Sequence, residues 1–320
     1  MKIVVTGAAG FIGSCLVKHL NQLGHKNLVL VDDFNKPGKS ANLAGAQYLQ
    51  QVDRMAYLAD PGSYEAAAIF HIGARTDTTE FNTAIFDELN LNYSKILWQH
   101  ATEHQIPFIY ASSAATYGDG ELGFDDLPER IPTLKPLNPY GQSKQDFDTW
   151  VLDQEAHPPF WVGLKFFNVF GPNEYHKGRM ASVVFHTFHQ IQRTGKMRLF
   201  ESHRPDFKDG EQSRDFVYIK DVLRVIQFWF ETQQQSGIYN LGTGTARTFN
   251  DLSTAVFRAM NLEPQIDYFP TPDDLRETYQ YYTCANMDRT LKAGYSGGFH
   301  TLEDAVTDYV KQYLIPNLGF

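Results

Sequence analysis

The sequence is poor in cysteine and has no long apolar run. Only Cys15 and Cys284 occur, without a Cys-x-x-Cys pair, so we expect no disulfide framework. No stretch of about 18 apolar residues suggests a membrane span. A strand-like run begins at residue 2, which leaves no room for a signal peptide. These absences predict a protein of the reducing cytoplasm.

Positive charge is also scarce, because 28 Lys and Arg residues face 37 Asp and Glu residues, for a net charge of −9. No overall basic field draws the chain to nucleic acid or to an anionic membrane, so a bound anion would need local cations. No internal repeat or low-complexity segment is visible, and we expect no metal site. The apolar content of 42% supports a full core, and 320 residues fit one large or two medium domains.

The beginning of the chain has the order of a dinucleotide-binding site. A short apolar run is followed by the turn Gly7-Ala8-Ala9-Gly10-Phe11-Ile12-Gly13, a helical pattern, and a second apolar run that ends in Asp32-Asp33. Glycines let the backbone approach a pyrophosphate, and the N-terminus of the next helix supplies N–H groups and positive dipole. Three glycines alone could simply form a turn. With an acid about twenty residues later, they predict a bound nicotinamide dinucleotide.

The same region leaves the choice of dinucleotide open. Asp32 is expected to hold the ribose 2′-hydroxyl, which favours NAD. Lys36 and Lys39 follow closely and could neutralise a 2′-phosphate, which favours NADP. An alternative is that both lysines belong to a solvated loop.

A tyrosine and a lysine stand four residues apart in Asn138-Pro139-Tyr140-Gly141-Gln142-Ser143-Lys144. On a helix this spacing brings Tyr140 and Lys144 together, and the ammonium group should lower the tyrosine pKa from its free value of about 10. An upstream strand-like run ends in Ser112-Ser113, whose hydroxyl can hydrogen-bond a substrate oxygen. An isolated pair of this kind is more often exposed surface. Beside a dinucleotide site, it predicts a base that oxidises an alcohol.

Strand-like and helix-like segments alternate through the first half of the chain. Strands are expected at 67–71, 107–111, 161–167, 214–218 and 238–242, and the main helices at 85–104, 140–155, 181–191, 221–231, 250–260 and 302–313. This alternation predicts an α/β fold, a Rossmann-type doubly wound parallel sheet with a smaller interleaved α/β substrate lobe.

The pattern changes after Gly171-Pro172, where a stretch rich in His, Lys and Arg begins. We expect the dinucleotide-binding domain to comprise residues 1–169 and about 214–244. The substrate lobe would comprise about 170–213 and 245–320, with a Pro-rich link at 264–272.

Over nearly its whole length, the chain resembles the extended short-chain dehydrogenase/reductase family. The residues that carry the resemblance are the three glycines, Asp32, Asn90, Ser112-Ser113, Tyr140, Lys144 and the run 214–218. Within that family, the chain is similar to the ADP-heptose 6-epimerases. That closer similarity rests on 111–118, 135–141 and above all 167–182, which contains His176-Lys177-Gly178.

The resemblance implies an isomerase that inverts C6″ of an ADP-heptose by an internal redox cycle with tightly held NADP. Its two bases would be Tyr140 and Lys177, while Ser113 would polarise the oxygen and Lys144 would hold the nicotinamide ribose. The product would serve the lipopolysaccharide inner core, and the family's pentamers imply a homo-oligomer. A loop lysine is normally solvated. It acts as a base near pH 7 only if desolvation or a neighbouring cation, such as His176 or Arg179, lowers its pKa.

The resemblance also assigns binding positions by their match to the family's motifs. For the cofactor these are Gly7, Gly10, Phe11, Ile12, Gly13, Asp32, Asp33, Lys39, Arg54, Ile72, Gly73, Ala74, Asn90, Lys144, Val169 and Lys177. For the sugar nucleotide they are Ser113, Asn168, Arg179, His186, Phe200, Glu201, Ser202, Arg214 and Tyr279. An alternative for His186 is a helix residue satisfied within the lobe.

The chain departs from the family pattern in two places. Ile72-Gly73-Ala74-Arg75-Thr76-Asp77 replaces a segment that is often Glu-Gly-Ala-Cys-Ser, and the loop between Phe200 and Arg214 looks several residues longer. These departures lie beside the cofactor and the nucleotide, so they bear on cofactor preference and on nucleotide contacts.

Related activities share this fold and remain alternatives. Dehydratases usually carry an acidic pair after the strand serine, where this chain has Ala114 and Ala115. An NAD-dependent sugar-nucleotide 4-epimerase would not need His176-Lys177-Gly178. A non-catalytic dinucleotide-binding regulator would commonly lack the tyrosine or the lysine, and both are present here.

Overall fold

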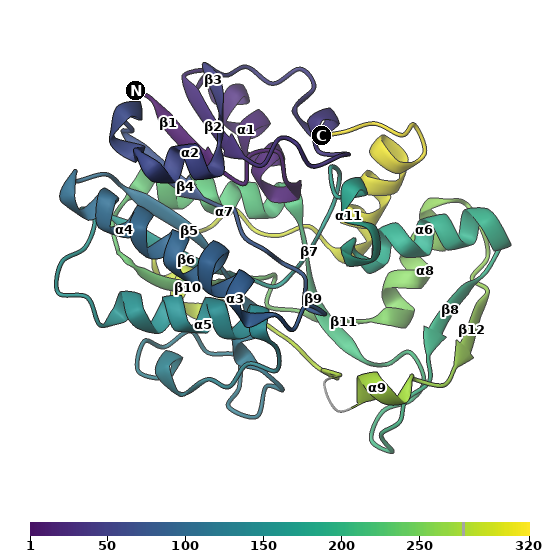
Figure 1. Cartoon of the computed structure of the whole chain (residues 1–320). Helices are drawn as coiled ribbons and strands as arrows, with labels where there is room; N and C mark the ends of the chain where they lie inside the picture. Colours follow the sequence, from purple (N-terminus) through teal and green to yellow (C-terminus); the bar gives the residue numbers. More distant parts are fainter. Residues whose placement is uncertain (277–278) are drawn as a thin grey trace.

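The computed structural model describes residues 1–276 and 279–320 and is built around one large parallel sheet (Figure 1). The sheet has seven strands in the order β10-β6-β5-β4-β1-β2-β3. Their bounds are β1 Ile3–Thr6, β2 Leu28–Asp32, β3 Gln50–Asp53, β4 Ala68–His71, β5 Phe108–Ser113, β6 Trp161–Phe166 and β10 Gly237–Leu241. The chain runs outward from β1 to β3 and then returns to β4 beside β1. This reversal of strand order is the Rossmann-type topology that the sequence predicts, and the fold class is confirmed.

Helices cover both faces of this sheet because its buried strands are apolar on both sides. One face packs against α1 (Phe11–Gln22) and α7 (Ile219–Thr232), and the other against α2 (Arg54–Ala59), α4 (Tyr93–Glu103) and α5 (Pro139–Leu152). On the second face, the ring of Trp98 contacts Phe108, Phe147 and Trp161 edge-on. Truncating so large a buried ring to alanine would cost about 3–5 kcal/mol.

The helix expected at 85–104 is interrupted in the structure. It begins as α3 (Thr83–Phe86), passes through a π-helical segment, Asp87–Asn92, and continues as α4. Such π-helical segments re-aim side chains and often lie at functional sites. Here the segment carries Asn90, which is buried.

A smaller part of the chain, which includes the segments labelled α6, α8, β8 and β12, lies on the right in Figure 1. Strands β7 (Asn168–Phe170), β9 (Ser213–Tyr218) and β11 (Ala246–Thr248) form one sheet, and β8 (Met197–Phe200) pairs with β12 (Ile266–Phe269). Helices α6 (Val183–Thr194), α8 (Phe249–Ala259) and α11 (Leu302–Tyr309) pack together. The shorter helices are α9 (Asp273–Arg276) and α10 (Asp288–Lys292). The short 3-10 and π turns are Ser40–Leu43, Pro61–Tyr64, Ala114–Tyr117, Ile131–Thr133, Tyr175–Met180 and Val310–Leu314.

Two local expectations differ from the structure. Strand β9 falls in a segment assigned to the cofactor-binding part, yet it pairs with β7 and β11 in the small sheet. Strand β12 lies inside the expected Pro-rich link, where its backbone pairs in parallel with β8. The division of the chain into two domains stays a prediction. Within the described residues, no helix combines the length and apolar character needed to cross a bilayer.

Candidate active site

A cavity of about 600 Å³ opens where the central strands end. Its walls include the ends of β1, β2 and β5, the segment 72–77 after β4, and residues 166–170, which begin with the last residue of β6. The small part closes the opposite side with residues 180–184, Phe216, Phe249 and Leu252. A crevice at the carboxyl ends of the strands, where strand order reverses, is the usual ligand site of such sheets.

The glycine turn at the cavity is shaped by close backbone contacts. Gly7 has φ +66, and a Cβ added to it would lie 2.6 Å from the Cα of Gly73. A Cβ on Gly13 would lie 2.1 Å from the Gly7 oxygen. Gly10 is the N-cap of α1 and provides no side-chain cap, so the first amides of this 12-residue helix stay available for an anion. The turn therefore fits a pyrophosphate.

Charged side chains gather at the end of β2. Asp32 accepts hydrogen bonds from the Ala9 amide at 2.9 Å and from Lys39 Nζ at 2.7 Å. Lys36 and Lys39 both line the cavity, so these lysines are not merely part of a solvated loop. Burial lowers the pKa of Lys36, and the nearby cations Lys39, Arg54 and Arg75 lower it further. A bound dianionic phosphate would reduce the electrostatic repulsion between these positive charges.

Tyr140 lies in the first turn of α5 and lines the cavity together with Ser113, the last residue of β5. The helix begins here because the Asn138 side chain accepts a hydrogen bond from the Gly141 amide at 2.8 Å. Burial raises the pKa of Tyr140, and a hydrogen bond with Ser113 opposes that rise. The tyrosine is therefore a protonated phenol near neutral pH.

The expected lowering of the Tyr140 pKa by Lys144 is wrong for the chain without a bound cofactor. Lys144 Nζ donates to the backbone oxygen of Ala111 at 2.7 Å, and burial lowers the pKa of Lys144 to about 8. The amine therefore carries only part of its charge in mildly alkaline solution. Desolvation of the phenol exceeds whatever this amine contributes, and the Tyr140 pKa rises.

Lys177 lies in the turn Tyr175–Met180 and also lines the cavity. Its amide donates to the Glu174 oxygen at 2.9 Å, and its Nζ lies 5.6 Å from the centre of the Phe11 ring. Burial lowers the pKa of Lys177, whereas the carboxylate of Glu174 raises it. Burial, rather than a cation neighbour, thus supplies the lowered pKa that the sequence argument required. Arg179 is instead 69% exposed and lies 3.4 Å from Asp77.

The predicted sugar-nucleotide residues lie in different places. Ser113 and Asn168 line the cavity. Phe200 and Tyr279 pack edge-on beyond it, and the guanidinium of Arg214 lies 5.6 Å from the Tyr279 ring. Burial lowers the pKa of Arg214, and this buried cation is 5.6 Å from the cavity-lining ring of Phe249.

Several predicted residues do not line the cavity. They are Asp33, Asn90, Arg179, His186, Phe200, Glu201, Ser202, Arg214 and Tyr279. Asn90 lies behind the wall, where its side chain bonds both the amide and the oxygen of Arg75 and so holds the 72–77 segment. His186 contacts the Arg179 oxygen at 3.3 Å on the surface. The roles of all these residues stay predictions.

The sequence reasoning missed part of the lining. The missed residues include Thr6, Arg75, Thr76, Asp77, Leu89, Tyr93, Met180, Phe249 and Leu252. The departure of 72–77 from the family pattern was the available signal for three of them. Phe249 and Leu252 gave no such sequence signal, because an apolar residue at the start of a helix is normally interpreted as part of the hydrophobic core.

Comparisons with known proteins agree with this geometry. The model of the NAD dependent epimerase/dehydratase family matches residues 3–242. A curated relative from Fusobacterium nucleatum, named ADP-L-glycero-D-manno-heptose-6-epimerase, is 45% identical over 324 residues, with 98% of each chain covered.

Solved structures show the same similarity. The crystal structure of Helicobacter pylori ADP-L-glycero-D-manno-heptose-6-epimerase has a TM-score of 0.82 and 28% identity, and the match covers 97% of this chain and 95% of that one. Thermus thermophilus UDP-glucose 4-epimerase in complex with NAD has a TM-score of 0.78 and 25% identity, covering 97% and 98%.

Proposed function

Because the chain belongs to the NAD dependent epimerase/dehydratase family, we propose that it is an isomerase that converts ADP-D-glycero-D-manno-heptose to ADP-L-glycero-D-manno-heptose at C6″. The observation that carries the proposal is the presence of Tyr140, Ser113 and Lys177 around the same cavity as the glycine turn. The name of the Fusobacterium relative supports the choice of sugar nucleotide.

The resident cofactor is a nicotinamide dinucleotide, and NADP fits the residues better than NAD. Both oxygens of Asp32 already accept hydrogen bonds, from Ala9, Asp33 and Lys39. That leaves the carboxylate poorly placed to receive a ribose hydroxyl. Lys36 and Lys39 instead offer charge to a 2′-phosphate. When bound, the dinucleotide supplies the hydride acceptor and donor that inversion at a carbinol carbon needs.

The two bases handle the proton of the substrate hydroxyl. An alcohol releases this proton on oxidation, and the ketone takes a proton back on reduction. Inversion places the hydroxyl on opposite faces of the carbon in the two epimers. Tyr140 would therefore serve one epimer and Lys177 the other, while Ser113 hydrogen-bonds the oxygen.

Arg214 would hold the ADP half of the substrate. Its guanidinium is buried against Phe249 and Tyr279 and donates hydrogen bonds to the backbone oxygens of Ser213 and Gln280. A buried guanidinium is suited to a pyrophosphate because its fork donates two parallel hydrogen bonds. The product would serve lipopolysaccharide inner-core synthesis, and we expect a homo-oligomer.

The test is to incubate the purified protein with each ADP-heptose epimer and to follow the C6″ configuration by NMR. Mass spectrometry of the copurified ligand identifies the cofactor. Turnover without added cofactor supports the proposal. Accumulation of reduced cofactor with a free oxidised sugar would show a dehydrogenase instead. Finding only NAD would overturn the cofactor choice and leave the epimerisation intact, whereas turnover of a UDP-hexose alone would favour a 4-epimerase.

A further inference from the structure

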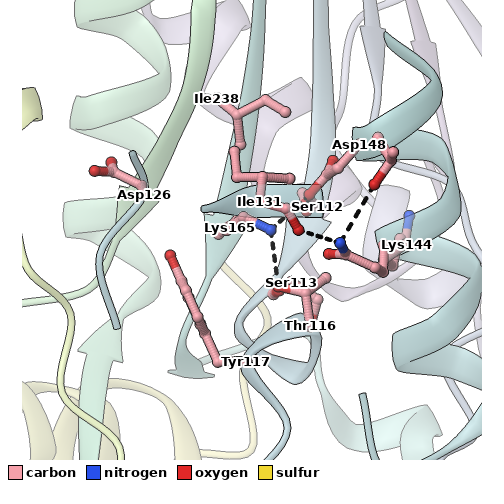
Figure 2. Close-up of polar contacts among 12 residues, drawn as sticks. Ser112, Ser113, Thr116, Tyr117, Asp126, Ile131, Lys144, Asp148, Lys165 and Ile238 are labelled. Atoms are coloured by element: carbon pink, nitrogen blue, oxygen red, sulfur yellow. Dashed lines mark hydrogen bonds and ion pairs between the residues drawn. The ribbon is translucent and has the colours of Figure 1, made fainter. Parts of the chain in front are cut away.

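A fully buried ion pair lies directly behind the side chains assigned to catalysis. Lys165 of β6 and Asp148 of α5 are both 0% exposed, and Lys165 Nζ lies 2.6 Å from Asp148 Oδ2. Figure 2 shows the pair between the end of β5 and helix α5. Neither residue lines the cavity, so the proposed chemistry does not use them directly.

Each partner is tied to the strand that carries the catalytic serine. Asp148 accepts hydrogen bonds from Ser112 Oγ at 2.6 Å and from Tyr110 at 3.0 Å, both on β5. Lys165 Nζ also donates to Thr116 Oγ1 at 2.8 Å, and Thr116 in turn donates to the backbone oxygen of Ser113 at 2.8 Å. The pair thus fixes β5 and the following turn from both sides (Figure 2).

The pair is tied equally to the helix that carries the tyrosine and the lysine. Asp148 follows Lys144 by one helical turn and Tyr140 by two turns, so the three residues share one face of α5. Lys144 itself donates to Ala111 of β5. The register of α5 against β5 therefore rests on contacts from Asp148 and Lys144 together.

We propose that Asp148 and Lys165 are positioning residues of the reaction: their buried ion pair aligns Ser113, Tyr140 and Lys144 and keeps the charge behind them balanced. The proposal rests on the proposed function, because the roles of the three aligned residues come from it. Loss of one charge should change how the neighbouring groups titrate, and loss of both charges should restore their titration.

The surroundings contain few other charges that could mask this effect. On the α5 side, Asp148 raises the pKa of Lys144 and of Tyr140. His71 of β4 stays neutral because burial lowers its pKa to about 3. Tyr110 stays a neutral phenol, because burial raises its pKa.

On the β6 side, the ring of Tyr117 lies 5.3 Å from Lys165 Nζ, and burial raises the pKa of this phenol. Asp126 lies beyond Tyr117, pairs with Arg289 at 3.6 Å and bonds the Asn240 amide at 2.7 Å. Asp126 is therefore a matched buried carboxylate that does not touch β5 or α5.

The experiment compares Asp148→Asn, Lys165→Met and the double variant with Asp126→Asn as the control. Lys144 is acylated with an amine-reactive reagent at a series of pH values, and the extent of acylation is measured by mass spectrometry of the peptide that contains Lys144. The protein is first freed of any copurified dinucleotide, so this readout involves neither substrate nor cofactor and its outcome is separable from failure of the epimerase proposal. The epimerisation rate against pH is measured alongside.

Asp148→Asn should move the Lys144 midpoint to lower pH by about one unit, and Lys165→Met should move it to higher pH. The double variant should return close to the wild-type midpoint near 8, and Asp126→Asn should stay there. If Asp148→Asn fails to fold, the opposite shift in Lys165→Met and its reversal in the double variant still decide the matter. Singles that leave the midpoint unchanged, or a double displaced as far as either single, would overturn the proposal.

Discussion

Lys144 and Ala111 are joined by a 2.7 Å hydrogen bond from the side-chain amine to the backbone oxygen. The bond directs the amine toward the end of β5, and the hydrogen bonds found among the described residues include none between Lys144 and Tyr140. The four-residue spacing on the helix therefore places Tyr140 and Lys144 at one site, but it does not join them by a hydrogen bond. The phenolate of Tyr140 would be favoured only when a positively charged nicotinamide ring lies beside it.

The buried amine of Lys144 makes folding stability depend on pH. Burial lowers its pKa to about 8, whereas an unfolded lysine titrates near 10.4, on the order of two units higher. At pH values between these two pKa values, the unfolded state binds more protons than the folded state, so the free energy of unfolding rises with pH. Lys144→Met should be more stable than wild type at pH 7, by at most about 3 kcal/mol, and this advantage should shrink toward pH 10.

Urea unfolding of both proteins at pH 7, 8.5 and 10 measures this difference. Lys196→Met is the control, because Lys196 is exposed and pairs with the exposed Asp267 at 3.0 Å. A stability difference between Lys144→Met and wild type that stays constant with pH would contradict the buried-amine account.

Tyr140→Phe should keep the fold and bound cofactor but lose most epimerisation. The substitution removes one hydroxyl beside Ser113 and leaves the ring packing against Phe86 unchanged. An acid–base group contributes about 10² to 10⁴-fold in rate. The rate with each epimer and the copurified cofactor are measured together.

Tyr117→Phe is the matched control for this substitution. It removes a buried hydroxyl that donates to Asn240 at 2.7 Å, away from the cavity lining. It should cost about 1 kcal/mol of stability and little activity. Near-normal epimerisation by Tyr140→Phe would exclude Tyr140 as the base.

Most strands of the central sheet could be predicted from sequence because they are short, buried and largely apolar runs. The edge strand β3 was missed because only Val52 of its four residues is buried, so Gln50–Asp53 reads as polar. Strand β12 was missed because prolines flank it and two of its four residues are exposed. Its strand character comes from pairing with β8, about seventy residues earlier in sequence.

The glycine turn gives a graded steric prediction. An alanine Cβ at position 13 would lie 2.1 Å from the Gly7 oxygen, a backbone atom that cannot move without shifting β1 or α1. At position 10 the nearest atom is 3.1 Å away. Gly13→Ala should therefore lower the melting temperature and cofactor retention strongly, whereas Gly10→Ala should do so only mildly. Equal effects of the two substitutions would show that packing of α1 on the turn is not the reason for Gly13.

The sequence predicted which side chains gather at the cavity better than it predicted their electrostatics. Motifs located Tyr140, Ser113 and Lys177, and the structure brings all three to one cavity. The Asp148–Lys165 pair was missed, because residues that meet across β6 and α5 share no local pattern. A lysine inside the apolar run of β6 was the available signal, since a buried charge must have a partner.

Lys177 gives the most specific prediction, because the two-base proposal requires it for one epimer only. Burial lowers its pKa, which favours the neutral amine that can accept a proton, and Lys177→Met keeps the apolar stem while removing that amine. Epimerisation should fall by about 10² to 10⁴-fold, while ADP binding survives because Arg214 is a separate group beyond the cavity wall. The double variant with Tyr140→Phe should lose little activity beyond the worse single variant, since the effects of groups that act as a unit are not additive.

The test measures the rates on both epimers and an ADP titration. The control is Lys208→Met, since Lys208 is an exposed lysine in a loop. Normal epimerisation by Lys177→Met would leave Tyr140 as the single base and favour a 4-epimerase type of chemistry. Loss of ADP binding with Lys177→Met would instead identify Lys177 as a phosphate ligand.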